Sequence, residues 1–136
     1  MRKYTLNLIK LASAIQDFEG WFPPSALRPF GSASFRNNNP GNIRWGNYAV
    51  SLGAIKKSPG NYAIFPDYAM GFGALCSFIS DACNGELPAY NPNKGLDAFF
   101  MVYAPFGDNN NPIRYANVVA NKLGVEVGAP IKNLLI

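Results

Sequence analysis

The sequence predicts an α+β fold that is mostly helical, with a small β-hairpin or three-stranded sheet beside a helical core. Apolar residues recur at helical spacing over residues 6–18 and again over 72–83. Between these two segments, short runs of strand-forming residues alternate with turns rich in Gly, Asn and Pro. The 136 residues are 49% hydrophobic and 15% charged, which fits one packed domain spanning residues 1–136.

The first helix is expected over residues 6–18 and to stop at Gly20 and Pro23-Pro24. Glu19 lies four residues after Ile15 and so continues the apolar face of this helix. Shelter by apolar neighbours favours the protonated form of a carboxyl group, as a general acid near neutral pH requires. A surface glutamate in a fraying last turn is the alternative. The helix dipole disfavours an anion there, so we favour the catalytic interpretation.

An asparagine-rich turn, residues 37–42, follows this helix and is centred on Pro40-Gly41. Asn carries a donor and an acceptor on a short stem, so several Asn side chains could bind the hydroxyl and acetamido groups of a neutral polymer. Trp45, Tyr48 and Tyr62 could supply aromatic faces for sugar rings. The alternative is a loop whose amides cap its own backbone.

The later elements are predicted from local signals. Asp67 stands directly before a helical run that ends at Gly85, so we assign it to N-capping rather than to chemistry. Gly71 and Gly73 weaken that helix, which suggests a close approach to another backbone. The other expected elements are strands at 42–45, 54–57 and 62–65, a helix at 95–104, and a last helix that starts at Asn111-Pro112 and runs to Gly124.

Composition excludes several classes of site. The chain has no His, which excludes Ser-His-Asp and Cys-His catalysis and His-ligated zinc. Two helical turns separate Cys76 from Cys83 by about 10 Å, too far for a disulfide, so we expect two core residues. No metal and no cofactor are predicted. The net charge of +4 suits an anionic envelope, and the scattered Lys and Arg make only a weak case for nucleic acid.

Several motifs together resemble a known family. They are Phe18-Glu19-Gly20-Trp21, Arg36 to Arg44, Phe65-Pro66-Asp67 with Gly71, Ala74 and Leu75, and Tyr103-Ala104-Pro105 with Asn109, Asn110, Asn111 and Tyr115. The chain resembles the lysozyme-like, lytic-transglycosylase-type domains of bacteriophage and prophage cell-wall-degrading enzymes over about residues 8–125.

This resemblance implies a lysozyme-like fold, peptidoglycan glycan strands as the partner, and Glu19 as the acid. It also implies that Tyr103 lies near the acid and that the following Asn and Tyr segment lines the sugar groove, although Tyr103 could equally be a core aromatic. The expected substrate-binding residues are Asn38, Asn39, Asn42, Arg44, Tyr62, Tyr103, Asn109 and Tyr115.

The motifs support Glu19 as a catalytic carboxylate and support no second one, although Asp108 could approach the groove. Hydrolysis by paired carboxylates is therefore less expected than attack by the substrate's own C6 hydroxyl, which gives a 1,6-anhydro-muramyl product. The close alternative is a hydrolytic muramidase that uses the same Glu19. Two other classes remain open: a non-catalytic peptidoglycan-binding or phage structural module, and a nucleic-acid-binding domain.

No signal peptide is expected, because Asn7 and Lys10 interrupt the apolar run after the basic start and no cleavage site follows. No membrane span is expected either. An enzyme acting on the wall from the periplasm would then be delivered by a phage particle, a holin or a secretion machine. We expect a monomer or a module of a larger phage or secretion assembly.

Overall fold

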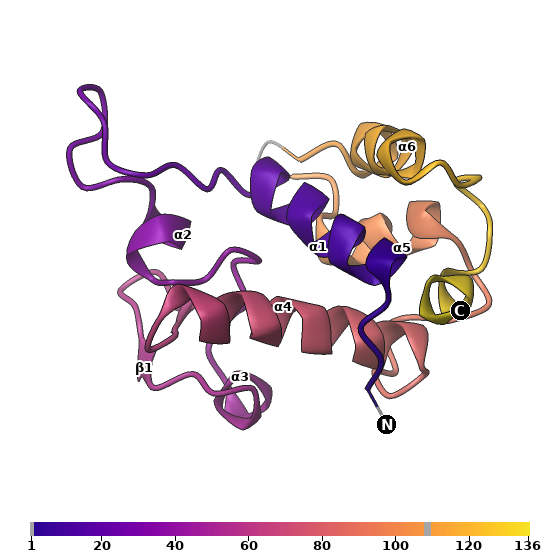
Figure 1. The fold of residues 1–136 in the computed structure, drawn as a ribbon, viewed down its shortest axis with the longest axis horizontal. Helices are drawn as coiled ribbons and strands as arrows, with labels where there is room; N and C mark the ends of the chain where they lie inside the picture. The colour runs from indigo at the N-terminus through magenta and orange to yellow at the C-terminus, as the bar shows by residue number, and fades with distance from the viewer. Residues whose placement is uncertain (1, 108–109) are drawn as a thin grey trace. The chain divides into compact units, whose positions relative to one another are not determined.

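A computed structural model describes residues 2–107 and 110–136, and these residues are mostly helical (Figure 1). The coarse prediction of a mostly α chain with a small sheet is confirmed. The elements are α1 (Leu6–Phe18), α2 (Ala33–Arg36), α3 (Asn47–Ser51), β1 (Lys56–Lys57), β2 (Ala63–Ile64), α4 (Tyr68–Cys83), α5 (Leu96–Tyr103), α6 (Pro112–Leu123) and a 3-10 helix, η1 (Ile131–Leu135).

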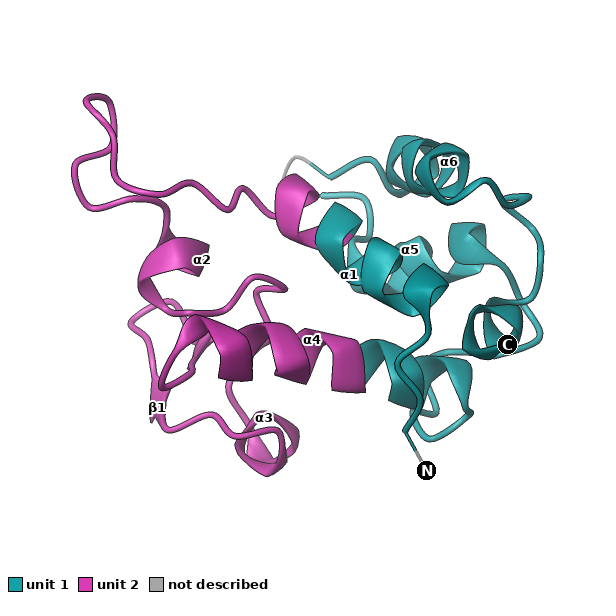
Figure 2. Ribbon diagram, viewed as in Figure 1, with its two compact units in different colours: residues 1–14, 78–136 teal, residues 15–77 magenta. Residues whose placement is uncertain are grey.

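Two compact units make up the chain (Figure 2). Unit 1 combines residues 1–14 with 78–136, and unit 2 is residues 15–77. The core of unit 1 is aromatic where α5 meets α6: Phe100 is fully buried and its ring stacks on Tyr115 at 4.2 Å between centroids. The organisation as a single domain stays a prediction.

Unit 2 contains a short antiparallel hairpin in which Lys56 pairs with Ile64 and Lys57 with Ala63. The strand expected at residues 42–45 is reduced to an isolated bridge between Arg44 and Tyr62. The strands at 54–57 and 62–65 are thus confirmed in shortened form, and the one at 42–45 only as this bridge. The sequence pattern missed α3, which begins directly after Gly46.

Helix ends follow the predicted capping residues. The Asp67 Oδ1 accepts the Met70 N–H at 2.8 Å, so Asp67 caps α4 as expected. Asn111 caps α6 by accepting the Arg114 N–H, and Gly124 ends α6 in the left-handed conformation with φ 70°.

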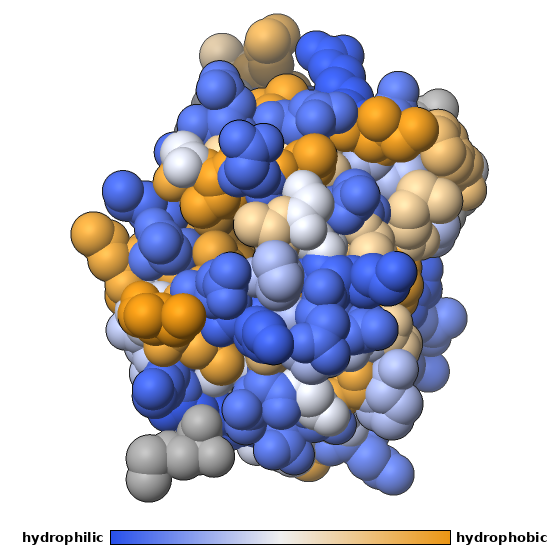
Figure 3. Space-filling view, turned by 90° about the vertical axis from the view of Figure 1, so that its right-hand side faces the viewer, coloured by the Kyte–Doolittle hydropathy of each residue, from blue (hydrophilic) through white to orange (hydrophobic). Residues whose placement is uncertain are grey.

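On the face drawn in Figure 3, apolar residues form small groups among hydrophilic ones. Within residues 2–107 and 110–136, no helix combines the length and apolar character needed to cross a bilayer.

Candidate functional site

The backbone of Glu19 is fixed by the way α1 ends. The Glu19 N–H continues the helical pattern by donating to the Ile15 carbonyl at 2.9 Å. Gly20 then turns left-handed with φ 72°, and the Trp21 N–H reaches back to the Gln16 carbonyl at 3.3 Å. This is a Schellman motif with Glu19 as the C-cap residue. The motif therefore fixes the position from which the half-buried Glu19 side chain extends at the end of α1.

Asn39 organises the asparagine-rich turn from within. Its side chain is fully buried, and its Nδ2 donates to the carbonyls of Ile43 and Ala63, both at 2.9 Å. Its Oδ1 accepts the Ile43 N–H at 2.9 Å. The amide thus joins the turn to β2 and presents no exposed atom to a ligand. Sequence reasoning placed Asn39 among the substrate-binding residues, whereas its burial assigns it to bracing the turn.

Asn38 and Asn42 lie within the turn on either side of Pro40-Gly41, and both have left-handed backbones, with φ of 51° and 48°. Asn tolerates this conformation better than other residues with a side chain. The half-buried Asn38 donates to the Phe65 carbonyl at 3.1 Å, so its amide also serves the fold. The Asn42 N–H closes the turn on the Asn39 carbonyl at 3.1 Å.

The side chain of Asn42 points to Glu19. Its Nδ2 donates to Glu19 Oε2 at 3.0 Å, which joins the end of α1 to the asparagine-rich turn. Both residues are half-buried, so the pair is sheltered yet reachable from solvent. A hydrogen bond from a neutral amide holds the orientation of a carboxyl group without adding a charge beside it.

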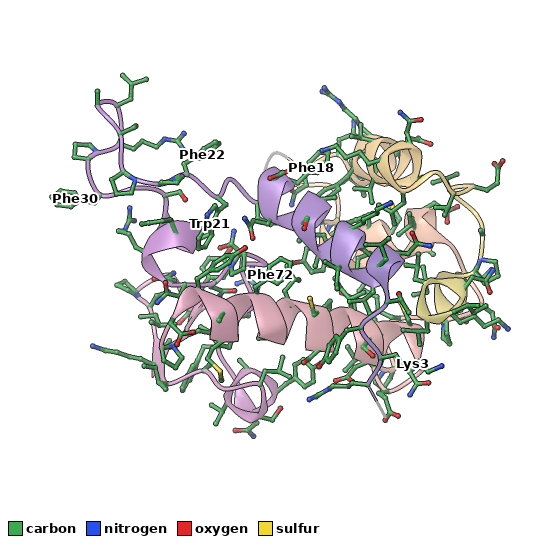
Figure 4. The ribbon with its side chains drawn as sticks, viewed as in Figure 1. Lys3, Phe18, Trp21, Phe22, Phe30 and Phe72 are labelled. Atoms are coloured by element: carbon green, nitrogen blue, oxygen red, sulfur yellow. The ribbon has the colours of Figure 1, made fainter. Side chains whose placement is uncertain are left out.

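A row of aromatic side chains lies in the same unit. Trp21, labelled in Figure 4, follows Glu19 by two residues. The centroid of its ring lies 5.2 Å from that of Phe35 and 5.0 Å from that of Tyr68. The Tyr68 hydroxyl donates to Gln16 Oε1 at 2.8 Å. Trp21 and Tyr68 keep part of their surface exposed and could hold a sugar ring. Sequence reasoning missed both as site residues, although Trp21 belongs to the motif Phe18-Glu19-Gly20-Trp21.

Arg44 and Tyr62 form a second polar and aromatic pair on the hairpin side of unit 2. The Arg44 guanidinium lies over the Tyr62 ring, 5.2 Å from its centroid. Arg44 is exposed and Tyr62 is half-buried, so both can contact a ligand from solvent.

The remaining predicted residues belong to unit 1. Tyr103 is half-exposed and stacks on Phe99 at 5.6 Å, whereas Tyr115 is only 5% exposed and packs on Phe100. This burial makes Tyr115 a core aromatic rather than a groove residue. Asn109 and Asp108 lie outside the described residues.

No metal centre is evident within residues 2–107 and 110–136, because no three His, Cys, Asp or Glu side chains gather there. Cys76 and Cys83 are free and buried, as predicted. Burial raises the pKa of the Cys76 thiol to about 11 and that of Cys83 to about 12, so both stay protonated at neutral pH.

Comparison of the chain with family models, with curated proteins and with solved structures gave no match. The candidate site therefore stands on its own geometry and on the motifs of the sequence.

Proposed function

We propose that this chain is a peptidoglycan lytic transglycosylase with a lysozyme-like fold. It cleaves the β-1,4 bond between N-acetylmuramic acid and N-acetylglucosamine. The observation that carries the proposal is the half-buried Glu19 carboxyl group held at 3.0 Å by Asn42 beside the asparagine-rich turn. A carboxyl group placed in this way can act on a bound neutral sugar as acid and then as base.

In the proposed reaction, Glu19 gives its proton to the glycosidic oxygen as the bond to the anomeric carbon breaks. The C6 hydroxyl of the same muramic acid then attacks that carbon, and its proton returns to Glu19. The products are a 1,6-anhydro-muramyl end and a free 4-hydroxyl on the other fragment. No water and no second protein carboxylate take part.

The other acids of unit 2 support this single-carboxylate route. Residues 15–77 contain only two more acids, Asp17 and Asp67. Asp17 is exposed on α1, and Asp67 is occupied in capping α4. Hydrolysis with paired carboxylates needs a second carboxyl group on the other side of the glycosidic bond, several ångströms from the first. Neither Asp17 nor Asp67 offers a sheltered carboxyl group for this role in unit 2.

The test compares Glu19→Gln with Asp17→Asn on purified sacculi. Both changes replace a carboxyl group by an amide at the end of α1, but only Glu19→Gln removes the proposed acid. Clearing of turbidity should fall about 10²–10⁴-fold in Glu19→Gln, as expected for loss of a general acid, while binding to sacculi persists. Asp17→Asn should clear at the wild-type rate. Undiminished clearing by Glu19→Gln would refute the catalytic role and favour a peptidoglycan-binding module.

Mass spectrometry of the released fragments distinguishes the reaction types. Fragments lighter by one water than the reducing product indicate the anhydro end of a transglycosylase. Reducing ends would instead make the chain a muramidase that uses the same Glu19 with a bound water.

Asn42→Ala tests the proposed orientation of the acid. A hydrogen bond to the protonated, neutral carboxyl group contributes about 0.5–1.5 kcal/mol, so clearing should slow roughly twofold to tenfold. Asn38→Ala is the matched control, because its amide serves the Phe65 carbonyl rather than Glu19. An equal loss of activity at both positions, at unchanged stability, would contradict a specific role for Asn42.

A further inference from the structure

Residues 22–30 form an exposed loop, here called the apolar loop, that projects from unit 2 (Figure 4). Leu27 is 95% exposed and Phe30 is 78% exposed at its outer part, and Phe22 at its base is 46% exposed. Large apolar side chains displayed together to water are typical of a surface that meets an apolar partner.

The backbone of the apolar loop is held by its own hydrogen bonds. Its two ends meet where the Ser32 N–H donates to the Phe22 carbonyl at 2.9 Å and the Phe22 N–H donates to Ser32 Oγ at 3.0 Å. Its tip is closed by Ser25, whose N–H donates to the Arg28 carbonyl at 2.8 Å. Prolines at 23, 24 and 29 restrict the chain further. The loop therefore holds Leu27 and Phe30 away from the core of unit 2.

Charge indicates what kind of partner this loop meets. Residues 20–66 contain no Asp or Glu and carry five basic residues, Arg28, Arg36, Arg44, Lys56 and Lys57. Arg28 belongs to the apolar loop itself, and its guanidinium lies 4.3 Å from the centroid of the Phe22 ring. Apolar side chains beside an arginine, in a segment without acids, match an apolar layer covered by anions.

We propose that the apolar loop docks on an anionic lipid surface. Leu27 and Phe30 enter the boundary between headgroups and acyl chains, and Arg28 contacts lipid phosphates. The nine residues of the loop favour lipid over a protein partner, because a stable protein interface takes about 800 Å² from each side. Such interfacial contact needs no membrane-spanning helix, and it is independent of the proposed cleavage reaction.

The experiment measures binding of the full chain to lipid vesicles by co-sedimentation. One set contains equal amounts of phosphatidylglycerol and phosphatidylcholine, and the other contains phosphatidylcholine alone. The wild type should bind the anionic set more tightly, and added salt should weaken that binding. Leu27→Ser combined with Phe30→Ser should lower the partition coefficient about a hundredfold, since each large apolar side chain contributes about tenfold when buried. Arg28→Gln should lower it about fivefold on anionic vesicles only.

Ile55→Ser is the matched control, because Ile55 is also an exposed apolar residue of the acid-free segment, at 64%, but lies outside the loop. It should bind as the wild type does. All variants should keep the wild-type melting temperature, since none removes a buried side chain. The proposal is overturned if anionic vesicles do not bind the wild type, or if the double variant binds them equally well. It is also overturned if sedimentation velocity shows a dimer that the double variant abolishes while vesicle binding is unchanged.

Discussion

Replacing Gly71 by alanine tests how helix α4 holds the asparagine-rich turn. A Cβ added at Gly71 would lie 1.7 Å from the carbonyl oxygen of Asn38 and 2.8 Å from its carbonyl carbon. Both atoms belong to the backbone, so the turn itself would have to retreat by more than about 1 Å to restore ordinary contact. Overpacking of this kind costs about 1–3 kcal/mol or more, which exceeds the roughly 0.5–1 kcal/mol that alanine contributes in a helix. We expect Gly71→Ala to be destabilised by about 1–2 kcal/mol, which is the difference between these two effects.

Gly73→Ala is the control within the same helix. A Cβ at Gly73 has no atom within 4 Å, so only the helical preference changes and the protein should gain about 0.5–1 kcal/mol. Thermal unfolding followed by circular dichroism should move in opposite directions for the two variants, by about 3–5 °C for each kcal/mol. If Gly71→Ala melted at or above the wild-type temperature, the close packing of α4 on the turn would be refuted.

Two further outcomes follow from buried polar groups and buried thiols. Asn39→Ala should be destabilised by about 3 kcal/mol in urea unfolding, because it leaves the Ile43 N–H and two carbonyls without the amide that serves them. A loss below about 1 kcal/mol would contradict the bracing role. Cys76 and Cys83 should resist iodoacetamide at pH 8 in the folded protein and react once it is unfolded. Because their folded pKa values are raised from 9.0 to about 11 and 12, their contribution to stability is complete below pH 9 and is lost as the pH rises through 11 and 12. Flat stability between pH 9 and 11 would contradict this burial.

The four longer helices α1, α4, α5 and α6 were predictable because their signals are local, whereas the short helices α2, α3 and η1 were not predicted. The apolar spacing and Gly20 defined α1 as Leu6–Phe18, and Asp67 and Gly85 bounded α4. Helix α3 was missed because Asn47–Ser51 is a short run with strand-forming Tyr48 and Val50 and no helical period. Its conformation depends on packing in unit 2, where Ala49 is buried, rather than on local preference.

In the candidate site, too, local sequence signals do not determine which partners the side chains contact. Adjacent asparagines in the turn look equivalent in the sequence, yet their amides serve different partners. Asn39 is buried against Ile43 and Ala63, which come from residues 4 and 24 positions later, and Asn38 serves Phe65, 27 positions later. These pairings are made only when the hairpin folds over the turn, so no local pattern assigns them. Once Asn39 occupies the interior and the backbone of Asn42 turns left-handed, the Asn42 amide reaches the Glu19 carboxylate. Proposing Glu19 as the acid needed only a helix end, whereas finding its hydrogen-bond partner Asn42 needed the folded turn.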